Sequence, residues 1–147
     1  MPDADAGALV EIDTRFGKCA ALAADVVTIA EGVPGFERCR RYVLATSADI
    51  TPFTCVHGLD DSRPSFLAID PRLVVDGYAQ TLDAVQRQRL DATTDEPLLW
   101  LSLVRTDGDR ATVNLRAPIV INPRRMLGLQ VIPADSAYAL DHPLPID

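Results

Sequence analysis

A chain of 147 residues with a formal net charge of −7 is long enough for one domain, and its negative charge repels phosphate backbones, which argues against direct nucleic-acid binding. The same charge either suits a basic protein partner or simply keeps the protein in solution. No stretch of the sequence approaches the ~20 apolar residues of a membrane helix, and residues 1–8 contain neither a basic segment nor an apolar run, so we expect a cytoplasmic protein without a membrane partner.

Short runs of alternating or β-branched apolar residues follow one another after residues 1–8, which we expect to be a flexible tail. These runs predict strands at Leu9–Asp13, Val26–Ile29, Tyr42–Ala45, Phe53–His57, Ser65–Ile69, Leu98–Val104, Ala111–Leu115, Ile119–Ile121 and Leu127–Ile132. Turn residues separate them, and Asp107-Gly108 is typical of a β-hairpin. Residues 36–41 are expected to form one short helical turn.

One segment has helical spacing. In residues 82–90, Leu82, Val85 and Leu90 are expected to share an apolar face, with Thr81 as the N-cap. About ten short strands with one short helix predict a mainly β fold, a small antiparallel β-barrel-like or sandwich domain that spans residues 9–147.

Catalytic patterns are sparse. The sequence has no phosphate-binding loop, nucleophile elbow or His-Glu-x-x-His motif, and its three cysteines (Cys19, Cys39 and Cys55) match no zinc or redox spacing. Cys55 and His57 are two residues apart, so they would share one face of a strand, but nothing nearby supplies a third catalytic member. We therefore expect free thiols, no enzymatic activity and no cofactor, with a Cys55–His57 dyad as the minor alternative.

Two further kinds of cluster are weaker signals. Asp60-Asp61 and Asp107-x-Asp109 contain carboxylates that could bind a metal, but neither has the full ligand loop that calcium needs, and aspartate is common in turns. Arg38-x-Arg40-Arg41 and Arg124-Arg125 are either solvated surface or, where the two clusters converge in space, a grip for a carboxylate partner.

Five motifs occur in order from about Leu9 to Leu144. They are Thr14-Arg15-Phe16-Gly17; Glu31-Gly32-Val33-Pro34-Gly35-Phe36-Glu37; Phe66-x-x-Ile69-Asp70-Pro71; Asn114-Leu115-x-Ala117-Pro118-Ile119 with Asn122 and Gly128-x-Gln130; and Tyr138 with His142-Pro143-Leu144. Together they resemble the FliW family of flagellar assembly factors. The chain departs from the family pattern at Cys55-Val56-His57, Ile29-Ala30 and Asp141.

The resemblance implies a non-catalytic protein with a small antiparallel β fold and two alternating partners. One partner is the C-terminal region of flagellin. The other is CsrA, an RNA-binding repressor of flagellin translation, which the free protein would bind and antagonise, so that translation follows export. A chaperone that binds flagellin and has no CsrA branch is the alternative.

The resemblance also directs attention to motif residues as partner-binding candidates, although glycine, proline and asparagine in such motifs commonly shape turns. The candidates are Gly32, Pro34, Gly35, Phe36, Glu37, Asn114, Ala117, Pro118, Ile119, Asn122 and Gln130. Phe36 is expected to fill the core rather than face a partner.

Overall fold

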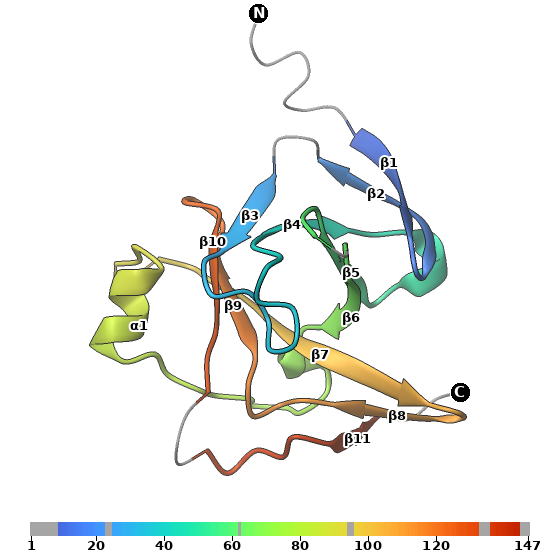
Figure 1. Cartoon of the computed structure of the whole chain (residues 1–147). Coiled ribbons are helices and arrows are strands. Elements are labelled where there is room, and N and C mark those ends of the chain that lie inside the picture. Colours follow the sequence, from blue (N-terminus) through green and yellow to red (C-terminus); the bar gives the residue numbers. More distant parts are fainter. Residues whose placement is uncertain (1–8, 23–24, 62, 94–95, 133–135, 145–147) are drawn as a thin grey trace, which may run out of the picture. The chain divides into compact units, whose positions relative to one another are not determined.

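The computed structural model describes residues 9–22, 25–61, 63–93, 96–132 and 136–144. The predicted tail at residues 1–8 lies outside the described residues. Antiparallel strands dominate the described residues, which also form one short α-helix and two 3-10 turns (Figure 1). The predicted mainly β, antiparallel fold class is confirmed. The contacts fall into two compact units, residues 1–67 and 68–147, and each is described by itself, while the single domain over 9–147 stays a prediction.

The first unit begins with a hairpin that forms a two-stranded sheet of its own. Strand β1 (Leu9–Thr14) pairs in register with β2 (Gly17–Leu22), a strand that the sequence analysis did not predict. The Thr14 hydroxyl donates to the Gly17 carbonyl at 2.8 Å and accepts from the Phe16 N–H at 3.0 Å. Gly17 has φ of +100°, which favours glycine. Local hydrogen bonds thus close the hairpin.

A three-stranded meander follows the hairpin. Strands β3 (Val26–Ile29), β4 (Arg41–Ala45) and β5 (Thr54–Gly58) are consecutive antiparallel neighbours, with the 3-10 turn η1 (Ala48–Ile50) after β4. Strand β6 (Ser65–Ile69) crosses the division between the units. The core of the first unit is a cluster of small apolar side chains, namely Cys19, Ala21, Val43, Ala45 and Cys55.

Strand β7 (Leu99–Asp107) organises the second unit. Its later half pairs with β8 (Arg110–Val113), and its first residues pair with β9 (Ile119–Asn122). Strand β10 (Leu127–Gln130) adds to β9, and β11 (His142–Leu144), which the sequence did not predict, adds to β8. A second cluster, Leu82, Leu90, Val120, Leu129 and Val131, forms its core. The 3-10 turn η2 (Pro71–Leu73) precedes this framework along the chain.

The predicted helix is present but shorter than expected. Helix α1 covers Ala84–Arg89, and Asp83, not Thr81, is its N-cap: the Gln86 N–H donates to the Asp83 carboxylate at 2.7 Å, and the Gln86 side chain bonds the Asp83 N–H at 2.9 Å. Leu82 and Leu90 are buried just outside the two ends. Val85 is 62% exposed, so its predicted place on the buried face is wrong. Because Leu82 precedes the first helical turn, the spacing from Leu82 to Val85 does not put them on one helical face.

Two other local predictions meet different outcomes. The helical turn predicted over residues 36–41 is wrong: Phe36 is bridged to Val33, and the Cys39 N–H closes a single turn onto the Phe36 carbonyl before β4 begins. The Asp107-Gly108 hairpin is confirmed, because Asp107 pairs with Arg110 and Gly108 has φ of +63°.

Candidate interaction surface

The loop at residues 32–37 in the first unit owes its shape to a glycine. Gly32 has φ of +66°, and a Cβ added there would lie 2.7 Å from the Glu37 Cα. The Phe36 N–H donates to the Val33 carbonyl at 2.7 Å, which brings the two sides of the loop together. Because backbone atoms fill the space beside Gly32, any other residue there would push this loop open.

The tip of this loop faces solvent. Pro34, Gly35, Phe36 and Glu37 are all exposed, and Phe36 is 37% accessible, so its predicted place in the core is wrong. The Phe36 ring packs edge-on against Phe66 with centroids 5.2 Å apart, which holds one side of the ring and leaves the rest in water. A partly held, partly exposed aromatic ring is a suitable anchor for a protein partner.

Glu37 helps to fix the loop. Its carboxylate accepts a hydrogen bond from the Gly35 N–H at 2.9 Å. This bond and a bond from its own backbone N–H lower the pKa of Glu37, so the side chain is charged at neutral pH. The exposed loop therefore presents an aromatic ring beside a carboxylate.

The adjacent arginine cluster is partly engaged within the protein. The Arg41 guanidinium bonds the Asp60 carboxylate through Nε at 2.9 Å and through Nη2 at 2.6 Å, and the backbone N–H groups of Arg40 and Arg41 bond it as well. These bonds, the Arg41 side chain first, lower the pKa of Asp60 to about 2. Asp60 was a candidate metal ligand in the sequence, and in the structure its carboxylate connects the start of β4 to the loop after β5 through these hydrogen bonds. Arg38 and Arg40 have exposed side chains.

The second arginine cluster also contacts carboxylates. Arg124 lies 3.8 Å from Glu96, and Arg125 lies 3.1 Å from Asp91. These two arginines belong to the second unit and Arg38, Arg40 and Arg41 to the first, so the two alternatives for these clusters, a solvated surface or a grip for a carboxylate partner, stay as predicted from the sequence.

The asparagine-proline motif of the second unit is largely internal. The Asn114 side-chain oxygen accepts from the N–H groups of Arg116 (3.2 Å) and Ala117 (3.0 Å), which turns the chain after β8. Ala117, Pro118 and Ile119 are buried. The Val131 N–H donates to the Pro118 carbonyl at 2.9 Å. Pro118 directly precedes β9, a position where proline is tolerated because it has no N–H to donate to a strand ladder.

Gln130 and Asn122 bond to the backbone around this motif. Gln130 Nε2 donates to the Ala117 carbonyl at 3.1 Å, while its Oε1 is buried with no hydrogen-bond partner among the described residues. Asn122 is fully buried, and its Nδ2 donates to the carbonyls of Leu90 (2.9 Å) and Asp91 (3.2 Å). The partner-binding role predicted for Asn114, Asn122, Gln130 and residues 117–119 stays a prediction.

The Cys55–His57 pair lacks the electrostatics of a nucleophile and base. Cys55 is completely buried, and this burial raises the pKa of its thiol, whereas a reactive thiolate needs a lowered pKa. His57 Nδ1 lies 2.7 Å from the Ser65 hydroxyl, and burial, followed by the charge of Arg63, lowers the pKa of His57. The imidazole thus bridges β5 to β6 in its neutral form.

The described residues lack two kinds of feature. They contain no group of three or more histidine, cysteine, aspartate or glutamate residues that could hold a metal ion. None of their helices has the length and apolar character needed to cross a bilayer. All three cysteines are free thiols.

The β1–β2 hairpin exposes apolar side chains that the sequence did not lead us to expect. Leu9, Val10 and Leu22 on the β1–β2 hairpin are 72%, 42% and 38% exposed. The sequence contains a signal for this exposure, because Leu9 and Val10 are adjacent apolar residues whose side chains must point to opposite faces of a strand.

Comparisons with known proteins agree with these motifs. The FliW protein family model matches residues 11–144. The flagellar assembly factor FliW of Geobacter sulfurreducens is 33% identical over 132 residues, covering 88% of this chain and 82% of the relative. Its counterpart in Clostridium botulinum is 32% identical over 122 residues, covering 82% and 85%. A crystal structure of the flagellar assembly factor FliW superposes with a TM-score of 0.78 at 28% identity, covering 91% of this chain and 96% of that one.

Proposed function

Because this chain belongs to the FliW family of flagellar assembly factors, we propose that it binds the C-terminal region of flagellin and, when free, binds and antagonises the translational repressor CsrA. The family match over residues 11–144 carries this proposal. Exchange between the two partners would couple flagellin translation to flagellin export. The proposal places the protein in the cytoplasm, where both partners are made.

The charge of the chain supports the CsrA arm. A protein that holds RNA must present positive charge to the phosphates, and this chain carries a formal net charge of −7. Opposite charges speed the encounter of two proteins and favour the correct pair. The family resemblance names the partner, and the charge provides a physical reason for the two proteins to associate.

The geometry of the loop at residues 32–37 supports the proposal that this loop contacts a protein partner. The loop projects the exposed Phe36 ring, which Phe66 holds from one side, and glycine geometry at Gly32 fixes its path. An ordered loop loses little conformational entropy on binding, so its apolar contact contributes more to affinity. We propose Pro34, Gly35, Phe36 and Glu37 as direct contacts, and Gly32 as the residue that shapes the loop.

Calorimetric titration tests the proposal. The protein is titrated with a peptide of the cognate flagellin C-terminal region, and the titration is repeated in the presence of CsrA. Submicromolar flagellin binding that displaces CsrA is the expected result. Flagellin binding without any CsrA interaction would favour the chaperone alternative, and binding to neither partner would overturn the proposal.

A pair of variants tests the loop. Phe36→Ala is expected to weaken binding of at least one partner by about tenfold or more, as truncation of an aromatic anchor does. Leu73→Ala is the matched control, because Leu73 is also an exposed apolar side chain but lies on η2 of the second unit. Equal affinities for Phe36→Ala, Leu73→Ala and the wild type would remove the loop from the proposed surface.

A further inference from the structure

Within the part of the chain that the structure describes, strand β1 is an open edge. It belongs to a two-stranded sheet in which β2 is its sheet neighbour, and Figure 1 shows it running along the outer side of that hairpin. Every residue of β1 is exposed or half-buried. An edge of this kind offers unpaired backbone N–H and C=O groups to any extended chain that lies against it.

The register shows which backbone groups point outward. Ala20 on β2 donates its N–H to the Thr46 carbonyl at 2.8 Å and accepts from the Thr46 N–H at 2.9 Å, so both of its backbone groups face away from β1. Glu11, which stands opposite Ala20, is therefore in a non-hydrogen-bonded pair. Because such pairs alternate along a strand, the N–H and C=O groups of Leu9, Glu11 and Asp13 point to the open edge.

The same three residues share one face of β1, and two of them are acidic. Cross-strand, Leu9 stands opposite Leu22 and Asp13 stands opposite Lys18. Lys18 approaches Glu11 at 3.5 Å, but both side chains are about 70% exposed, so this pair opens readily. The other face of β1 carries the apolar Val10 and Ile12 and ends at Thr14, and Val10 remains 42% exposed.

Charge decides which occupant fits this edge. A second copy would bring Glu11 and Asp13 of both chains to the shared edge, and each chain has a net charge of −7, so self-pairing is repulsive. A strand with basic side chains beside Glu11 and Asp13 and apolar side chains beside Val10 meets complementary surfaces on both faces. We propose that β1 captures an extended polypeptide segment of alternating basic and apolar residues as an added strand of the hairpin sheet.

This inference goes beyond the proposed function and does not depend on either partner named there. The probe is a capped synthetic peptide that alternates lysine and valine, titrated calorimetrically against the full chain, with amide hydrogen exchange followed by NMR. The expected result is binding that slows exchange at Leu9, Glu11 and Asp13. The same peptide with glutamate in place of lysine is expected not to bind. Binding that leaves these three amides unprotected would overturn the proposal.

Substitutions at Glu11 separate the backbone contact from the charge. Glu11→Pro removes one outward N–H and breaks no bond to β2, so the hairpin is expected to persist while lysine–valine binding falls about tenfold relative to Glu11→Ala. Glu11→Ala loses the same charge but keeps the N–H. Equal affinities of the two variants would overturn the added-strand geometry.

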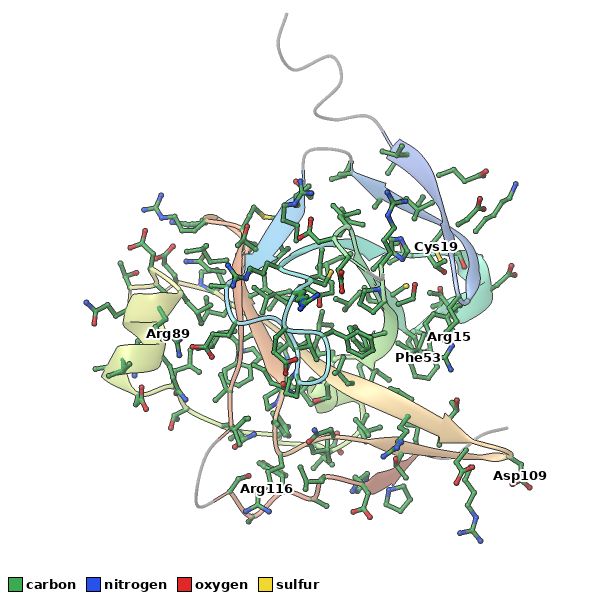
Figure 2. All side chains as sticks on the ribbon, viewed as in Figure 1. Arg15, Cys19, Phe53, Arg89, Asp109 and Arg116 are labelled. Carbon is green, nitrogen blue, oxygen red and sulfur yellow. The ribbon has the colours of Figure 1, made fainter. Side chains whose placement is uncertain are left out.

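Charge reversal provides a test that does not require proline at the edge. Glu11→Lys with Asp13→Lys is expected to switch the preference from the lysine peptide to the glutamate peptide. The control, Asp107→Lys with Asp109→Lys, makes the same change of net charge at the tip of the β7–β8 hairpin, where Asp109 is labelled in Figure 2. This control is expected to keep the preference for lysine. An equal switch in both variants would mean that net charge alone governs binding and would overturn the proposal.

Discussion

Asn122 is the motif residue whose loss should matter most for folding. Its side chain is fully buried and takes part in three hydrogen bonds: Nδ2 donates to the carbonyls of Leu90 and Asp91, and Oδ1 accepts from the Arg124 N–H at 3.1 Å. Leu90 is the C-cap of α1, so Asn122 satisfies carbonyls that the helix itself leaves unpaired. The residue thus joins the end of α1 to the turn after β9.

The size of the effect follows from these three bonds. Each neutral hydrogen bond contributes about 1 kcal/mol net, so the loss of all three in Asn122→Ala should lower the free energy of unfolding by about 3 kcal/mol. At roughly 3 °C per kcal/mol for a chain of this size, the melting temperature should fall by roughly 9 °C. Urea unfolding followed by circular dichroism measures the loss, with an unchanged m-value expected.

Two variants at asparagines of the same motif serve as controls. Asn114→Ala loses only two local bonds at a half-buried site, so its cost should be about 1 kcal/mol. Asn122→Asp keeps the shape but aims a carboxylate at two carbonyls, which raises its pKa in the folded state, so this variant should gain stability as the pH falls through that raised pKa. A loss below about 1 kcal/mol for Asn122→Ala would refute the role assigned to the buried bonds.

Three other predictions concern the first unit. Gly32→Ala should lower the free energy of unfolding by about 2–3 kcal/mol, because the alanine would have a positive φ and its Cβ would clash with the backbone. Gly35 has φ of +90° but open space around it, so Gly35→Ala should lower the free energy of unfolding by only about 1 kcal/mol. Equal melting temperatures of the two variants would contradict this prediction. The pKa of Asp60 is about 2, against an ordinary value of 3.8, so its contact with Arg41 stabilises the fold fully above pH 3.8 and this stabilisation is lost as the pH falls through 2. Asp60→Asn should therefore flatten the pH dependence of the free energy of unfolding between these two pH values. An acid-unfolding profile identical to that of the wild type would contradict this prediction. Native Cys55 should react with a thiol reagent only as fast as the protein opens, because it is buried and its pKa is raised; rapid labelling of the folded protein at neutral pH would revive the catalytic reading.

The amino-acid sequence by itself determined the local elements. Alternation and β-branching placed β3 and β6 at the observed residues, and Asp107-Gly108 located a hairpin, because strand periodicity and turn chemistry depend on neighbouring residues. The five motifs that occur in order from about Leu9 to Leu144 together indicated the family that the comparisons then showed. Strand β11 has only three residues, one of them proline, so its sequence pattern is too short to predict a strand that pairs with β8.

Only the tertiary structure decided which side of each element is covered. The apolar side chains of Val85 and Phe36 were predicted to be buried, yet both are exposed. The six-residue helix turns Val85 outward, and the bridge to Val33 places Phe36 on a loop. Asn122 was a candidate for a partner contact or for a turn, and its side chain is buried, where it donates to the carbonyls at the end of α1. The open edge of β1 also depends on tertiary pairing, since Ala20 bonds to Thr46 and thereby turns the backbone of Glu11 toward solvent. Burial and pairing depend on residues distant in sequence, which local patterns do not specify.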